Sequence, residues 1–234
     1  MAGYYGYNNN NPGGGMLSRL FQNLPTVTRN LFLINVLMFL ATLINQNFMV
    51  GTFAVFYPKS PFFRFWQPVT YMFMHGNFWH LFVNMWCLLM FGTALERTIG
   101  SRKYLIFYLV TGLGALAVHF LVQDLQAKAI IADAGQMSQA YIDILRTPTL
   151  GASGAIYGVQ IAYAMLYPDD LWTLVFPPVT LKAKWFVLIF MGIELFTGIT
   201  GTMDGVAHFA HLGGALFGFL LIYYWRKSGK LWRR

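Results

Sequence analysis

Residues 104–122 read YLIFYLVTGLGALAVHFLV, a run of 19 positions without a single Asp, Glu, Lys or Arg. A helix needs about 20 mainly apolar residues to cross the hydrocarbon of a bilayer. Backbone amides cannot stay unpaired in lipid, so a run of this kind is expected to be helical. The whole chain is 57% hydrophobic and only 10% charged, whereas soluble domains carry about 25% charged residues. The sequence therefore predicts an all-α membrane protein.

Apolar segments of this kind recur six times and predict a polytopic bundle of six transmembrane helices. They cover residues 30–48, 76–95, 104–122, 152–167, 184–200 and 206–225. The fourth is short, so we expect it to begin inside the membrane. The aromatic-rich connection 49–75 is expected to lie partly in the membrane interface. The connection 123–150 mixes charged and apolar residues and predicts a short surface helix.

These segments also define the domain organisation. Residues 1–25 combine a Gly/Asn-rich stretch, which we expect to be disordered, with a short amphipathic segment. Residues 26–228 hold the six-span domain, and residues 229–234 form a basic cytoplasmic tail.

The net charge of +8 is explained by membrane topology rather than by nucleic-acid binding. With a cytoplasmic N-terminus and six spans, both termini are cytoplasmic, and twelve of the sixteen basic residues fall on that side. The outer side then holds only Lys59, Arg64, Lys128 and Arg146. We therefore expect no nucleic-acid partner.

Polar side chains inside spans are costly and usually functional. His80 and Asn84 lie four residues apart near the start of the second span, Ser153 opens the fourth, and His211 lies early in the sixth. All three spans run inward from the outer side. At 1.5 Å per residue, these four side chains lie within about 10 Å of the outer end of their spans. Three helices thus bring a hydroxyl, an imidazole and an amide to one level.

Small residues favour close packing of the fourth span against the sixth. Gly154 and Gly158 share one helix face, and Gly214 and Gly218 share another. Small residues four apart allow membrane helices to approach closely. This packing would bring the hydroxyl and the imidazole within hydrogen-bond reach.

The chemistry of these groups suggests acyl transfer. Ser153 is the candidate nucleophile, and His211 is the candidate base that takes its proton. His80, Asn84 and the backbone N–H of Ser153 are candidate donors to an oxyanion. Glu194 in the fifth span is the one acid that could lie at this level, as a proton relay, a cavity-lining residue or a structural acceptor. We assign it no catalytic role and expect a Ser–His dyad without a third acid.

The sequence resembles the rhomboid family of intramembrane serine proteases from about residue 26 to residue 226. GASG at 151–154 resembles the family's GxSG motif, and HLFVN at 80–84 resembles its HxxxN motif. AHLGG at 210–214, followed by Gly218, resembles its AHxxGxxxG motif. Each motif alone is weak, but their order and their positions on the spans are specific.

The resemblance implies an endopeptidase with Ser153 as nucleophile, His211 as base, and His80 and Asn84 binding the oxyanion. It also implies a supporting role for Tyr157, which matches a tyrosine that stacks near the base. Supporting glycines are Gly151, Gly154 and Gly214. Gln67 follows Trp66 where the family has a Trp-Arg pair, which puts in doubt the loop or lipid contacts of that arginine.

The implied partners are transmembrane protein substrates and the lipid bilayer. No cofactor is expected, and no metal, because neither an HExxH motif nor a carboxylate cluster accompanies the histidines. The expected location is a bacterial inner (plasma) membrane. The oligomeric state stays open.

Other interpretations compete with this one. Ser153 could simply cap a helix, His80 and Asn84 could link helices, and His75 and His208 could order loops or water. At the level of the whole protein, an inactive relative that binds membrane clients and a transporter are the alternatives. The gathering of polar residues at one end of the spans disfavours a transport pathway.

Overall fold

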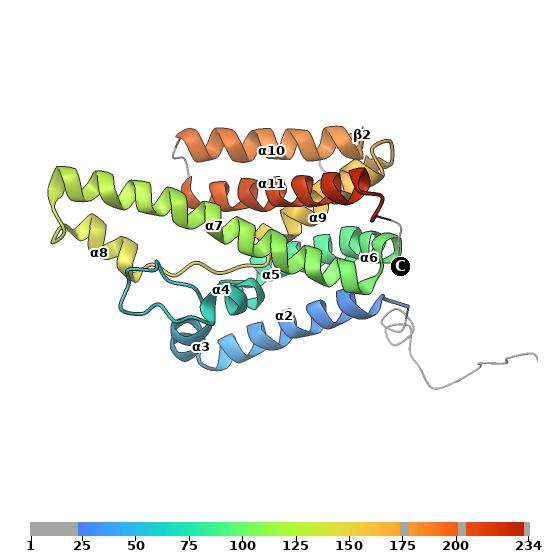
Figure 1. Cartoon of the computed structure of the whole chain (residues 1–234). Coiled ribbons are helices and arrows are strands. Elements are labelled where there is room, and N and C mark those ends of the chain that lie inside the picture. Colours follow the sequence, from blue (N-terminus) through green and yellow to red (C-terminus); the bar gives the residue numbers. More distant parts are fainter. Residues whose placement is uncertain (1–22, 174–177, 201–204, 232–234) are drawn as a thin grey trace, which may run out of the picture.

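A computed structural model describes residues 23–173, 178–200 and 205–231, without the side chains of 205–207. Helices dominate the described residues (Figure 1). The elements are α2 (Thr26–Ile44), α3 (Gln46–Phe53), α4 (Gln67–Thr70), η1 (Tyr71–Phe73), α5 (Phe78–Cys87), η2 (Leu88–Gly92), α6 (Thr93–Ile99), α7 (Ser101–Ala134), α8 (Gln139–Arg146), α9 (Ser153–Leu166), β1 (Leu171–Thr173), β2 (Thr180–Lys182), α10 (Ala183–Thr200) and α11 (Gly205–Lys227). The predicted tail at 1–22 and the last residues of the basic tail lie outside the described residues.

Four of the described helical stretches are long and apolar enough to cross a membrane: Thr26–Ile44, Phe78–Ile99, Ser101–Ala134 and Ala183–Thr200. Only 17–44% of the residues in their most apolar windows are buried inside the protein. Large hydrophobic side chains therefore cover the outside of the bundle, as expected for a surface that faces lipid rather than water. The prediction of an all-α membrane protein is confirmed.

The short helix α9 lies in the middle of the bundle, packed against α7, α10 and α11 (Figure 1). Its 14 residues extend over about 21 Å at 1.5 Å per residue, less than the roughly 30 Å thickness of a hydrocarbon core. Eight of those residues are buried, among them three alanines and two glycines. The sequence correctly indicated that this segment is short.

The first apolar segment is helical earlier than predicted. It spans Thr26–Ile44 rather than 30–48, because the chain changes direction at Asn45. The backbone of Asn45 is extended, at φ −146° and ψ 84°, and its side-chain oxygen accepts a hydrogen bond from the N–H of Phe48. Asn45 therefore ends α2 and caps α3.

The second apolar segment is one continuous helix, Phe78–Ile99, with a π-helical turn at Leu88–Gly92. Near its far end, the buried carboxylate of Glu96 accepts hydrogen bonds from the N–H groups of Val27 and Thr28, at 2.9 and 2.7 Å. It also accepts from the hydroxyls of Thr28 and Ser101. A charge buried with four donors is well satisfied, and here it caps the first turn of α2.

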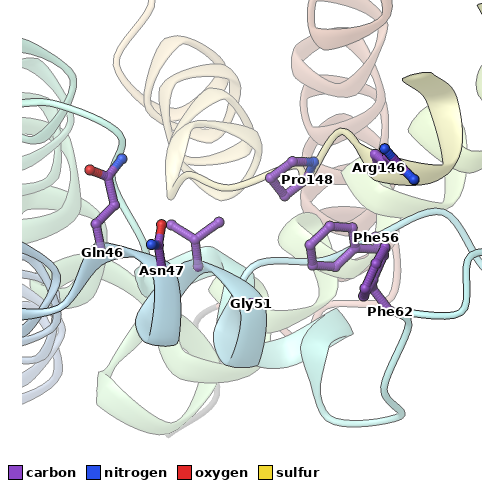
Figure 2. Close-up of a pocket in the computed structure, with 8 residues that line it drawn as sticks. Gln46, Asn47, Gly51, Phe56, Phe62, Arg146 and Pro148 are labelled. Carbon is purple, nitrogen blue, oxygen red and sulfur yellow. The ribbon is translucent and has the colours of Figure 1, made fainter. Parts of the chain in front are cut away.

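The connections at the opposite end hold more helix than predicted. Helix α7 continues to Ala134, well past residue 122, and is followed by the predicted short surface helix α8, which has no buried residue. A pocket of about 490 Å³ lies beside α3, and Figure 2 shows residues that line it. Its lining consists of Gln46, Asn47, Val50, Gly51, Phe56, Phe62, Arg146 and Pro148.

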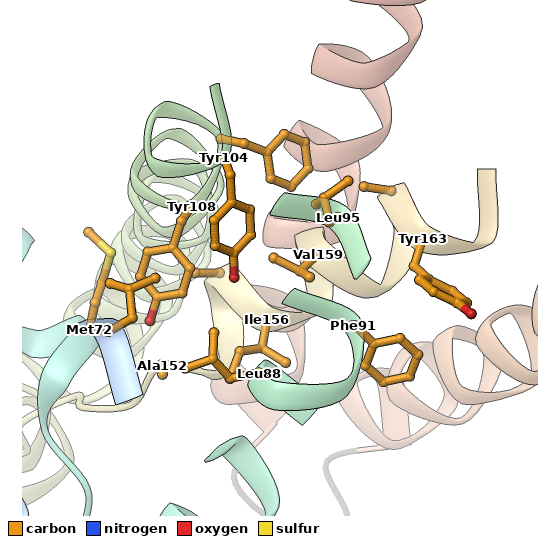
Figure 3. Packing of buried hydrophobic residues seen from close by; sticks show 14 of the residues in the cluster. Met72, Leu88, Phe91, Leu95, Tyr104, Tyr108, Ala152, Ile156, Val159 and Tyr163 are labelled. Atoms are coloured by element: carbon orange, nitrogen blue, oxygen red, sulfur yellow. The ribbon is translucent and has the colours of Figure 1, made fainter. Parts of the chain in front are cut away.

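The core joins α5–α6, α7 and α9. Figure 3 shows Leu88, Tyr104, Tyr108, Ile156 and Val159 among the side chains packed together there. These five side chains are almost fully buried. This cluster fixes α9 against its neighbours, and α9 carries the serine singled out above.

Candidate active site

Helices α9 and α11 touch backbone to backbone. A Cβ atom built on Gly214 would lie 1.9 Å from the carbonyl oxygen of Gly154, and one built on Gly218 would lie 2.7 Å from the Cα of Gly158. Neither position has room for a side chain. The predicted close approach of these helices through glycines is therefore present.

This approach brings Ser153 and His211 together. The Oγ atom of Ser153 lies 2.8 Å from Nε2 of His211, a normal hydrogen-bond distance. Ser153 is the first residue of α9, and the cap position belongs to Ala152. The interpretation of Ser153 as a helix cap therefore fails, because its hydroxyl pairs with an imidazole on another helix.

Tyr157 covers one face of the histidine. Its ring is stacked on the His211 ring, with centroids 4.4 Å apart and planes 12° from parallel. Tyr157 lies one turn after Ser153, so a single helix supplies both the hydroxyl and the ring that fixes the imidazole plane. The stacking predicted from the resemblance is thus found in the structure.

The backbone of Gly151 lies between the side chains of Ser153 and His80. Its φ of +141° is a conformation that side chains disfavour, and its N–H donates a hydrogen bond to the carbonyl of Tyr71. A Cβ atom there would lie 3.0 Å from Nε2 of His80 and 3.4 Å from Oγ of Ser153. Glycine at this position lets the imidazole and the hydroxyl face the same space.

Asn84 lies one turn beyond His80 on the helix that begins at Phe78. It is buried, and its amide nitrogen Nδ2 has no hydrogen-bond partner among the residues that the structure describes. A buried donor without a partner is costly.

Glu194 of α10 reaches the same site, which the sequence did not predict. Its Oε2 atom lies 2.5 Å from Nδ1 of His208 and 3.1 Å from Nδ1 of His211. Its Oε1 atom accepts a hydrogen bond from the hydroxyl of Tyr157. A carboxylate thus lies beside the expected dyad, although Nδ1 of His211 has no hydrogen-bond partner among the described residues. One feature of the sequence does point to this residue, because Glu194 is the single carboxylate in the apolar segment 184–200.

His75 packs behind His80, with ring centroids 5.0 Å apart. It is fully buried, and neither ring nitrogen has a partner within the described part of the chain. Burial, and secondly the neighbouring His80, lowers the pKa of His75 to about 3. His75 is therefore a neutral side chain that supports the ring of His80.

Gln67 organises the connection between α3 and α5. Its fully buried amide accepts a hydrogen bond from the N–H of Arg64 at 2.9 Å and donates one to the carbonyl of Phe62 at 3.2 Å. The doubt raised by the missing arginine is thus answered in part, because Gln67 itself makes loop contacts.

Glu194, His208 and His211 also form a group whose potential metal-ligating atoms lie within 4.8 Å of one another. The two oxygens of Glu194 already accept hydrogen bonds from Tyr157 and His208. This geometry is that of a hydrogen-bonded carboxylate, and we retain the prediction of no metal.

Fold and site together define a helical membrane protein in which a serine and a histidine from two closely packed helices form a hydrogen bond. The sequence model of the Rhomboid domain family matches residues 63–228 of this chain. The matched range includes Ser153, His211, His80 and Asn84. The chain belongs to the rhomboid family.

Three relatives illustrate this membership. The chain is 28% identical over 199 residues to rhomboid-like protein 11, chloroplastic, of Arabidopsis thaliana, covering 82% of this chain and 63% of that protein. It is 32% identical to RHOMBOID-like protein 12, mitochondrial, of the same plant, covering 73% of this chain and 49% of that protein. It is 28% identical to the rhomboid protease AarA of Providencia stuartii, covering 67% and 54%. The chain thus spans about half to two thirds of the length of these relatives.

Proposed function

We propose that this protein is an intramembrane serine endopeptidase that cleaves transmembrane proteins, with Ser153 as nucleophile and His211 as general base. The 2.8 Å contact between Oγ of Ser153 and Nε2 of His211 is the observation that carries the proposal. Membership of a family that includes a protease supports it.

The reaction begins when Nε2 of His211 takes the hydroxyl proton and Oγ attacks the peptide carbonyl carbon. The electron pair of the carbonyl π bond moves to its oxygen, which becomes an oxyanion. Collapse of this intermediate expels the amine, which receives the proton from Nε2. Water then adds to the ester on Ser153 by the same steps and releases the acid.

The oxyanion is bound by the Ser153 N–H, by His80 and by Asn84. The first N–H groups of a helix have no intrahelical acceptor, so that of Ser153 is available at the start of α9. Further donors are Nδ2 of Asn84, which has no partner in the part of the chain that the structure describes, and the His80 ring beside Gly151. Preorganised donors of this kind stabilise charge only as it develops.

The proposed topology has six spans, with α9 and α11 added to the four long apolar stretches, and with both termini in the cytoplasm. The excess of basic residues on that side supports this orientation. The substrate class is single transmembrane segments that can unwind at small residues. The relatives include chloroplastic and mitochondrial proteins. The proposed location of this chain in a bacterial inner membrane therefore rests on its sequence alone.

The test is cleavage of a transmembrane reporter by the purified chain in detergent and in liposomes. Native protein is compared with Ser153→Ala and His211→Ala, and with Ser138→Ala as a matched control, because that serine caps α8. We expect cleavage to fall by at least about 10³-fold in the first two variants and to persist in the third. Cleavage that survives Ser153→Ala would overturn the assignment.

A further inference from the structure

We propose that Glu194 is a positioning residue for His211, which acts on the Ser153–His211 pair through the imidazole ring. This inference rests on the proposed function and extends it. It is carried by one arrangement: the two nitrogens of the His211 ring face groups from two other helices. Nε2 lies 2.8 Å from Ser153, and Nδ1 lies 3.1 Å from Glu194.

The role follows from what happens to the imidazole. After taking the proton of Ser153 at Nε2, His211 carries protons on both nitrogens and a positive charge. A carboxylate at Nδ1 then accepts a hydrogen bond from the charged ring, which is stronger than one between neutral groups. Glu194 itself stays ionised and transfers no proton. Before the reaction, the negative charge 3.1 Å from Nδ1 favours the tautomer with the proton on Nδ1 and leaves Nε2 free to act as base.

The surroundings of Glu194 favour this role. Its side chain is only 12% exposed, in a span otherwise apolar, where a single charge is costly without partners. Tyr157 donates to Oε1, and His208 lies 2.5 Å from Oε2. Because Tyr157 also stacks on His211, the same tyrosine fixes both the carboxylate and the ring that it serves.

The resting geometry leaves this interaction incomplete. Nδ1 of His211 has no aligned hydrogen bond among the described residues, although the carboxylate lies at 3.1 Å. The electrostatic gain is therefore greatest when the ring becomes charged, which is the condition for lowering the barrier rather than only binding substrate.

The activity test compares Glu194→Gln and Glu194→Asp with a matched control on the same helix, Thr197→Val. Among the described residues, the Thr197 hydroxyl bonds to its own helix, at the carbonyls of Ile193 and Glu194. We expect Glu194→Gln to lower kcat by about 10²-fold, less than loss of the carboxylate in a soluble triad, with KM within about twofold. Glu194→Asp keeps the charge and should retain more activity than Glu194→Gln, while Thr197→Val stays near native.

A second measurement does not depend on proteolysis. In protein labelled with ¹⁵N-histidine, the Nδ1 proton of His211, assigned with the Ser153→Ala and His211→Gln variants, should resonate far downfield and move upfield in Glu194→Gln. Native kcat in Glu194→Gln, equal losses in the Gln and Asp variants, or an unmoved resonance would overturn the role of Glu194. Cleavage that persists in Ser153→Ala would instead refute the proposed function, and the resonance would still decide the contact between Glu194 and His211.

Discussion

Helices α10 and α11 both reach the candidate site, but they are attached to the rest of the protein in different ways. Helix α11 contacts α9 through glycine backbones that leave no room for a side chain. Helix α10 has only two buried residues, Ala183 and Val187, both near its start. Beyond Val187, Glu194 makes polar contacts with the bundle, where it reaches Tyr157, His208 and His211.

This difference affects how tightly two distances in the candidate site are fixed. The distance between Ser153 and His211 is fixed by rigid backbone contact, which tolerates almost no change in volume. The distance between His211 and Glu194 depends on a helix that has no buried residue beyond Val187. The proposed nucleophile and base are thus preorganised, whereas the position of Glu194 is adjustable.

The largest effect is expected where the rigid contact is broken. Gly214→Val would place a branched side chain against the carbonyl of Gly154, whose oxygen lies 1.9 Å from the position of the new Cβ. Overpacking usually costs about 1–3 kcal/mol, and backbone against backbone cannot relax as side chains do. We expect a lower thermal midpoint in detergent and cleavage reduced by at least about 10²-fold, since a displacement of about 1 Å can cost this much.

The matched control lies on the loosely attached helix. A Cβ atom on Gly192 of α10 meets nothing within 4 Å. Gly192→Ala should therefore leave activity unchanged and raise stability slightly, by about 0.5–1 kcal/mol, because alanine favours helix. Equal damage from both glycine substitutions would contradict the contrast between the two helices.

Asn84→Ala tests the oxyanion donors without touching the helix contact. The amide nitrogen has no partner in the described residues, so its removal leaves few lost bonds in the resting protein. Loss of one oxyanion donor typically costs about 10²–10³-fold in kcat. We expect that loss with little change in KM or thermal midpoint. Native turnover in this variant would remove Asn84 from the mechanism.

The smallest effect concerns pH and His75. Its pKa is about 3 in the folded protein, against an ordinary value of 6.5, so the unfolded chain binds the extra proton first as the pH falls. The stability that His75 contributes is complete above about pH 6.5 and is lost towards pH 3. His75→Phe should make the decline of the thermal midpoint between pH 6.5 and pH 4 shallower. An unchanged decline would show that His75 does not titrate in this way.

The sequence predicted the approach of Ser153 to His211 better than the position of Glu194. Glycines at a spacing of four and polar residues at one depth are local patterns, so the approach of Ser153 to His211 followed from the period of a helix. The rotation of α10 about its own axis leaves no such pattern, because the helix is apolar nearly all round. The direction in which Glu194 points was therefore not readable.

Two features of the fold were hidden for similar reasons. The continuation of α7 to Ala134 passes through Gln123, Asp124 and Lys128, whose polarity resembles that of a loop although helices also extend beyond a membrane. The end of α2 depends on the extended backbone of Asn45. Such single-residue choices are set by how the next helix packs, which one sequence does not reveal.

The π-helical turn at Leu88–Gly92 has a consequence for how this protein tolerates change. Each residue of an α-helix turns the chain by about 100°, and a π turn takes up one residue more than a regular turn. The turn therefore sets the phase between His80 and Asn84 at one end and Glu96 at the other. Deleting one residue from this turn should leave each end correctly formed on its own, yet rotate the carboxylate away from the start of α2. The two ends of this helix therefore make separate contacts, and the π turn sets the angle about the helix axis between them.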